Sequence, residues 1–158
     1  MLEKQLKVVD EKIAERAVAN EQVLLLETVP GMAHYSALAI QSRIGNVERF
    51  KHADSLANYF GLTPGCRNSG EATQRLGSIT KCGSKLVRYL LNQAVIKVLR
   101  HDGIMRAWFQ RIKKRRGAKI ARVAVMRRLA TIIWHMVKNN EAYVIGGPPR
   151  RKLVGQTA

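Results

Sequence analysis

The sequence is poor in the features that mark several common protein classes. It has only two cysteines, Cys66 and Cys82, which lie sixteen positions apart without a neighbouring Cys or His. This spacing excludes a paired-cysteine metal site and a disulfide framework, so we expect free thiols in a reducing cytoplasm. No apolar run approaches the roughly 20 residues that span a bilayer. The N-terminus lacks the pattern of a signal peptide, and we expect no membrane partner.

Acidic residues are scarce in the second part of the chain. Residues 65–158 contain three (Glu71, Asp102 and Glu141) against 21 Lys and Arg, whereas residues 1–64 carry 8 acidic and 7 basic residues. Two-metal phosphodiester chemistry needs several convergent carboxylates, so a self-contained metal nuclease is excluded and we expect no cofactor bound by this chain. The formal net charge of +17 instead indicates a nucleic-acid partner.

Period-two alternation of apolar residues is also absent, and helical spacing takes its place. The 158 residues suit one domain with a hydrophobic core, and we predict an all-α fold. Glycines at 45, 61, 103 and 117 are expected to end helices. The predicted helices cover residues 34–44, 54–60, 83–101, 104–116 and 118–139.

The N-terminal stretch has the apolar spacing of a coiled coil. Its apolar residues alternate spacings of four and three and are Leu2, Leu6, Val9, Ile13 and Ala17. Such a helix either packs on its own domain or pairs with a second copy. We therefore divide the chain into an amphipathic linker helix (1–23), a helical domain (24–145) and a flexible basic tail (146–158).

Residues 24–45 resemble a helix-hairpin-helix, with Pro30-Gly31 as the turn. In that motif the turn presents backbone N–H groups to a nucleic-acid phosphate, so Gly31 is a candidate contact. The usual second glycine is replaced by Ala33. The alternative is a plain helical hairpin used for packing.

Residues 104–138 combine many cations with apolar residues at helical spacing, which predicts helices with one buried and one basic face. Almost no acids accompany these cations, so their repulsion favours an external polyanion. The candidate contacts here are Arg115, Arg116, Lys119 and Arg122. The aromatic residues of this stretch could stack on bases, although core packing fits their spacing better: Trp108, Phe109 and Trp134.

A Gly/Pro-rich loop around Ser69 is followed by further cations that open a helix. An exposed serine hydroxyl could attack a phosphate, and neighbouring cations could stabilise the charge that develops. The candidate cations are Arg67, Arg75, Lys81, Lys85 and Arg88. Taken alone, Asn-Ser-Gly is more often only a turn.

An ordered set of short segments over residues 20–145 resembles a bacterial insertion-sequence transposase family. Full-length members of that family join a RuvC-like domain with four acidic residues to a C-terminal domain with a catalytic serine. The matching segments, in chain order, are residues 29–32, 49–50, 56–64, 69–70, 79–84 and 86–91, followed by Lys119 with Ala121 and by Tyr143.

The resemblance implies that Ser69 is the nucleophile that attacks a DNA phosphodiester and forms a phosphoserine link. It also implies a guide RNA as a second partner and homo-oligomers of the full-length protein. Magnesium is expected only with the RuvC-like domain. Residues 1–20 would then be the end of the coiled coil that connects the two family domains.

The RuvC-like half has no counterpart in these 158 residues, which suggests a truncated form or a natural remnant that cannot transpose DNA alone. Two other interpretations stay open. One is a non-enzymatic helix-hairpin-helix module that only holds DNA or RNA. The other is a basic structural protein of a ribonucleoprotein, which would need neither Ser69 nor the ordered segments.

Overall fold

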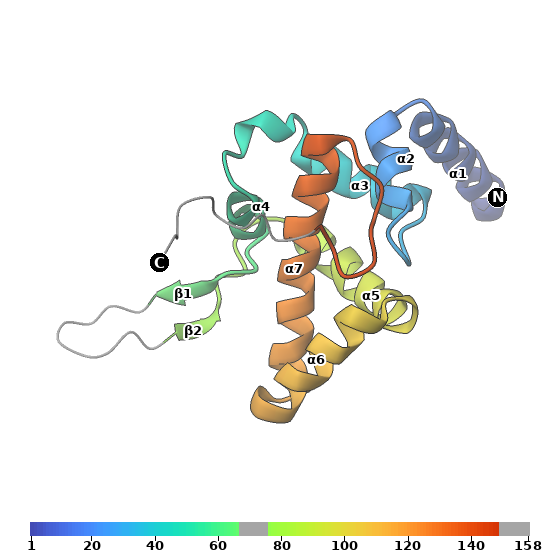
Figure 1. The fold of residues 1–158 in the computed structure, drawn as a ribbon. Helices are drawn as coiled ribbons and strands as arrows, with labels where there is room; N and C mark the ends of the chain where they lie inside the picture. The colour runs from blue at the N-terminus through green and yellow to red at the C-terminus, as the bar shows by residue number, and fades with distance from the viewer. Residues whose placement is uncertain (67–75, 149–158) are drawn as a thin grey trace.

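Helices dominate the computed structural model, which describes residues 1–66 and 76–148 (Figure 1). The predicted all-α class is confirmed, with a short two-stranded hairpin added to it. In chain order the elements are α1 (Leu2–Val18), α2 (Glu21–Glu27), α3 (His34–Ile44), the 3-10 helix η1 (Val47–Arg49), α4 (Ala53–Tyr59), β1 (Pro64–Cys66), β2 (Leu76–Ile79), α5 (Lys85–His101), α6 (Gly103–Arg116) and α7 (Ala118–Asn139).

Short polar side chains cap free backbone N–H groups at the start of three of the α-helices. The Asn20 side chain accepts hydrogen bonds from the first turn of α2, and Ser84 Oγ accepts one from the first turn of α5. Asp102 Oδ1 accepts a hydrogen bond of 2.8 Å from the Met105 amide in the first turn of α6.

The observed helix bounds lie within two residues of the predicted ones, and α3 and α7 coincide with them. The expectation that Gly103 ends a helix is wrong. α5 ends at His101 and Gly103 is the first residue of α6, so the break lies at Asp102. The reason is that Asp102 is extended and caps α6 with its side chain.

The antiparallel pair of β1 and β2 was not predicted from the sequence. Pro64 pairs with Ile79 and Cys66 with Leu76, with an irregularity of register between them. Strands of three and four residues with a bulge are too short to show an alternating apolar pattern.

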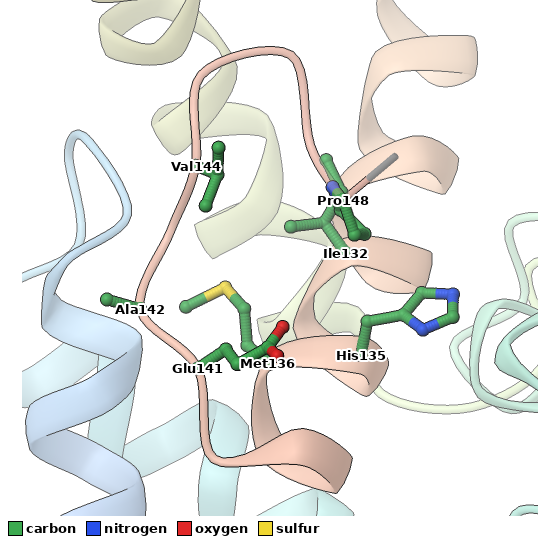
Figure 2. Close-up of a pocket in the computed structure, with 7 residues that line it drawn as sticks. All are labelled: Ile132, His135, Met136, Glu141, Ala142, Val144 and Pro148. Carbon is green, nitrogen blue, oxygen red and sulfur yellow. The ribbon is translucent and has the colours of Figure 1, made fainter. Parts of the chain in front are cut away.

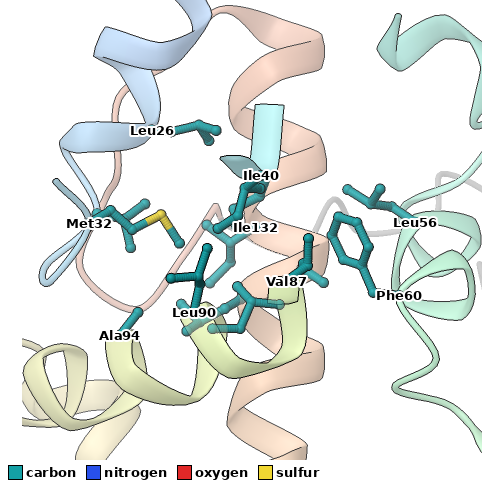
Figure 3. Close-up of a cluster of buried hydrophobic side chains, with 14 of the residues drawn as sticks. Leu26, Met32, Ile40, Leu56, Phe60, Val87, Leu90, Ala94 and Ile132 are labelled. Atoms are coloured by element: carbon teal, nitrogen blue, oxygen red, sulfur yellow. The ribbon is translucent and has the colours of Figure 1, made fainter. Parts of the chain in front are cut away.

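Helix α7 forms the centre of the core, and α2, α4, α5 and α6 pack around it (Figure 1). Figure 3 shows buried side chains from α2, α3, α4 and α5 meeting Ile132 of α7. We call α2–α7 the helical body. Trp134 and Phe109 pack against its core, and the Trp134 indole N–H donates to the Phe50 carbonyl at 3.0 Å. Their expected packing role is thus confirmed.

Helix α1 packs against α2 and α3 at its C-terminal end, where Ala17 is fully buried. The side chains of Leu2 and Leu6 at the other end are 75% and 58% exposed. The apolar pattern does not continue as one helix into α2, because the chain breaks at Asn20. The division of the chain at residue 23 and pairing with a second copy stay predictions.

Residues 141–148 form a C-terminal strap that returns along α7 (Figure 2). The Tyr143 amide donates to Thr28 Oγ1 at 2.8 Å, and the Gly146 amide donates to Asp102 Oδ2 at 2.6 Å. Gly147 lies against Ile132 of α7. The packed structure therefore extends past the predicted start of the tail at residue 146, and residues 149–158 lie outside the described part.

Candidate nucleic-acid interface

The β1–β2 hairpin leads to the segment that carries the predicted nucleophile. Ser69, with Arg67 and Arg75, lies outside the described residues, so their roles stay predictions. The structure does describe what we call the hairpin base, residues 60–63 and 80–83. There the Thr80 amide donates to the Thr63 carbonyl at 3.0 Å, and the Lys81 amide donates to the Gly61 carbonyl at 3.2 Å.

Two glycines allow close backbone approaches at the hairpin base. Gly61 and Gly83 have φ angles of +74° and +88°, a region that L side chains rarely adopt. A Cβ at Gly83 would lie 2.2 Å from the Tyr59 carbonyl oxygen, and one at Gly61 would lie 2.0 Å from the Cys82 carbonyl oxygen. Glycine at 83 therefore allows the backbone contact with α4, and glycine at 61 allows the contact between the two segments of the hairpin base.

Arg88 of α5 reaches back to this base. Its Nη1 donates to the carbonyls of Phe60 and Cys82, both at 3.1 Å, and of Gly83 at 3.4 Å. The Arg88 side chain is half-buried and has three protein acceptors, and its predicted contact with nucleic acid stays a prediction. Lys85, one turn earlier, is exposed and has no partner within the described residues.

Lys81 is the one lysine with a left-handed backbone among the described residues, with φ of 54°. This conformation is uncommon for a residue with a side chain. It directs the chain from β2 into the turn before α5, and the Lys81 side chain is exposed. Two accessible cations thus follow β2 in the chain: Lys81 in the hairpin base and Lys85 at the start of α5.

The largest collection of cations lies where α6 meets α7, at the far end of α7 from η1 (Figure 1). We call residues 111–122 the basic corner. All its cations are exposed, none forms an ion pair within the described part of the chain, and the segment contains no acid. The seven are Arg111, Lys113, Lys114, Arg115, Arg116, Lys119 and Arg122.

A helix dipole accounts for only a fraction of this charge. Four of the seven cations lie in the last turn of α6, where they interact favourably with a dipole of about half a unit charge. Seven positive charges exceed that greatly. The basic corner therefore keeps a strong positive potential, which suits the phosphates of a polyanion.

Other cations of residues 104–138 interact with groups of the protein itself. Arg127 pairs with Asp54 at 3.4 Å, and Lys138 pairs with Glu48. Arg128 Nη2 donates to the Gly146 carbonyl at 2.9 Å, and its guanidinium lies 5.7 Å from the Trp108 ring centroid. The basic run thus divides into a structural part and the exposed basic corner.

The turn between α2 and α3 lies against α5. Gly31 has φ of +89°, and a Cβ there would lie 2.7 Å from Lys97 Cβ. The space in front of this glycine is therefore filled by the protein itself. Contact of its backbone with a phosphate stays a prediction.

Sequence reasoning gave no role to Asp102, which is fully buried at the junction of α5 and α6. The Tyr143 hydroxyl donates to its Oδ2 at 2.6 Å. Burial alone would raise the pKa of Asp102, but hydrogen bonds from Tyr143 and from the Gly146, Met105 and Ile104 amides lower its pKa overall. Burial, and then the hydrogen bond to the Asp102 carboxylate, raises the pKa of Tyr143. The pair holds the strap against the junction of α5 and α6.

Other kinds of site find no support in the described residues. No cluster of three His, Cys, Asp or Glu side chains that could hold a metal ion occurs there. In residues 1–66 and 76–148, no helix is both long and apolar enough for a membrane span. The pocket beneath the strap (Figure 2) is mostly apolar and contains no cation of the basic corner.

Comparison with known proteins places these features in a family. Residues 23–110 match the Transposase IS116/IS110/IS902 family. The chain is 30% identical to the transposase for insertion sequence element IS1111A of Coxiella burnetii, over 87% of this chain and 38% of the relative. It is 27% identical to a probable family 20 transposase of Pseudomonas aeruginosa, over 90% of this chain and 43% of the relative.

A third relative has a different name. The pilin gene-inverting protein of Moraxella bovis is 28% identical over 78% of this chain and 39% of the relative. The chain thus spans about two fifths of the length of these three relatives. The matched region runs from within α2 into α6, and the chain belongs to the IS116/IS110/IS902 transposase family.

Proposed function

We propose that this chain acts in DNA transposition or recombination, as the nucleic-acid-binding C-terminal domain of an insertion-sequence transposase. In this proposal Ser69 supplies the nucleophile for DNA strand cleavage and exchange. A RuvC-like domain with its magnesium ions completes the active site, and the chain alone is inactive. DNA is the first partner, and a guide RNA and further copies of the full-length protein join it.

The observation that carries the proposal is the exposed basic corner in a chain that belongs to a transposase family. Its unpaired cations suit a phosphate backbone. The names of the relatives support DNA rearrangement as the process. Support for Ser69 comes from the family resemblance of its sequence segment, and the exposed Lys81 and Lys85, which follow the hairpin in the chain, could stabilise charge on a phosphate.

In the proposed chemistry the Ser69 hydroxyl loses its proton to a base and its oxygen attacks a DNA phosphorus. A phosphoserine bond forms, the bond from phosphorus to one sugar oxygen breaks, and that oxygen leaves as a hydroxyl. A second DNA hydroxyl then attacks the phosphoserine and releases the serine.

Covalent trapping tests the proposal. The chain is combined with a RuvC-like domain, guide RNA and end-labelled DNA, and adducts are counted on a denaturing gel. We expect an adduct with the native chain and none with Ser69→Ala, while both bind DNA with the same dependence on salt. An adduct that survives Ser69→Ala would refute serine chemistry.

The alternative function is a non-enzymatic helix-hairpin-helix module that binds DNA or RNA. The turn at Gly31 has the required order of helix, turn and helix, but Lys97 occupies the space beside it. If no adduct ever forms while salt-sensitive binding persists, this alternative replaces the enzymatic proposal.

A further inference from the structure

The carbonyls that accept hydrogen bonds from Arg88 belong to two separate segments. Phe60 ends α4 before the hairpin, and Cys82 and Gly83 follow the hairpin. A single guanidinium nitrogen, Nη1, joins these two segments. Because the carbonyl dipoles converge on it, the positive charge of Arg88 is already partly compensated inside the protein.

The same two segments are fixed to the helical body. Phe60 and Leu62 are buried in the core on the way into the hairpin, and the Leu62 amide donates to the Ala57 carbonyl at 3.0 Å. On the way out, no side chain of residues 80–83 is buried, and the segment is held by backbone hydrogen bonds and by Arg88. Arg88 therefore joins residues 82 and 83, which have no buried side chain, to Phe60, which is buried in the core.

We infer that Arg88 is a positioning residue that fixes the β1–β2 hairpin on α4 and α5, and is not a phosphate ligand. The inference rests on the proposed function in one respect, since the hairpin matters to the reaction only if Ser69 is the nucleophile. Lys85 differs, because it is exposed at the start of α5 without a protein partner. It is the residue of this helix end that is available to a phosphate.

The experiment compares Arg88→Ala with Lys85→Ala, since each removes one positive charge from the first turn of α5. Amide hydrogen exchange of Thr80 and Lys81 is measured by NMR on the 158-residue chain. Binding to a labelled DNA duplex is measured over a range of salt concentrations. The Ile133 amide in α7 serves as the reference for global unfolding.

In Arg88→Ala we expect Thr80 and Lys81 to exchange about ten- to a hundredfold faster, as the loss of a charge-assisted hydrogen bond implies. Ile133 and the salt slope of binding stay unchanged. In Lys85→Ala we expect unchanged exchange and a salt slope smaller by about one. The inference fails if Arg88→Ala reduces the salt slope as Lys85→Ala does and leaves the exchange of Thr80 and Lys81 unchanged.

If Arg88→Ala does not fold, Arg88→Lys decides. It keeps the charge but loses the planar group that reaches carbonyls on both segments. We expect faster exchange at Thr80 and Lys81 with an unchanged salt slope, and native exchange rates in this variant would overturn the inference. Neither measurement involves Ser69, so a failure to trap a DNA adduct would refute the proposed function and leave this inference standing.

Discussion

The sequence marks Arg88, which binds the hairpin base, and the cations of the basic corner alike as candidate contacts, but their surroundings differ. At the hairpin base, the Arg88 guanidinium is half-buried and shared among three carbonyls. At the basic corner, seven cations stand exposed with no acceptor among the described residues. The first arrangement stabilises the fold, and the second is open to a ligand.

The difference teaches that positive charge becomes evidence of binding only after its internal partners are counted. Arg127, Arg128 and Lys138 belong to the same basic run as the corner, yet each has a partner within the molecule. Substitution of an internally satisfied charge should change stability, and substitution of an exposed one should change the salt dependence of binding.

The largest expected effect comes from removing four charges of the basic corner at Arg115, Arg116, Lys119 and Arg122, each replaced by Gln. If all four contact phosphates, the salt slope of duplex binding falls by about 3.6 and affinity near physiological salt falls by about a thousandfold. Fluorescence anisotropy at several salt concentrations measures both.

The matched control removes four exposed cations of α1, namely Lys4, Lys7, Lys12 and Arg16, also as Gln. It changes the net charge equally but leaves the basic corner intact. An equal loss of salt slope in both variants would show that only the total charge matters, and the basic corner would then not be a specific binding surface.

The next effect tests a charge that is wholly satisfied inside the protein. We expect Asp102→Asn to reduce the free energy of unfolding by about 3 kcal/mol at pH 7, since it places an amide against the donors that now hold a carboxylate. Urea denaturation measures this, and duplex binding by the folded variant should keep its salt slope.

The pH dependence follows from the direction of the pKa shift at Asp102, which is lowered from 3.8. The stabilisation is fully present above pH 3.8 and is lost as the pH falls through the lower pKa of the folded state.

Glu48→Gln is the control for Asp102→Asn, since the exposed ion pair of Glu48 with Lys138 contributes about 1 kcal/mol or less to stability. Equal losses in the two variants would contradict the role given to Asp102.

The smallest effect concerns the close backbone fit of the hairpin base. Gly83→Ala should cost about 2 kcal/mol, because the new Cβ meets the Tyr59 carbonyl and the φ angle is positive. Gly45→Ala also has a positive φ angle but open space around it, so only backbone strain remains and its loss should be smaller. Thermal unfolding compares them, and a larger loss at Gly45 would argue against the tight fit.

Much of the fold could be predicted because the apolar spacing and the end signals of a helix lie within its own sequence. The apolar period of residues 118–139 and the glycine at 117 predict α7 to the residue. The hairpin could not be predicted, since its strands are short and its stability comes from α4 and from Arg88, 28 residues after Phe60.

The sequence predicted which part of the chain is rich in cations, but not which of these cations bind within the protein and which stay exposed. The exposure of Arg115 and Lys119 agrees with their predicted role as contacts, whereas the same reasoning could not separate Arg88 from Lys85. Asp102 was counted only as a scarce acid. Its role depends on Tyr143 and Gly146, which follow it by 41 and 44 residues, a distance that local patterns do not span.

The C-terminal strap also bears on how the protein is made. Thr28 and Asp102 emerge from the ribosome well before Tyr143 and Gly146, the residues that bind them. Until the strap arrives, a carboxylate destined for the interior must remain in water, and the junction of α5 and α6 cannot close around it. Burial of the Asp102 carboxylate therefore requires the strap, and we expect a chain that ends before residue 143 to be cleaved faster by proteases than the full chain.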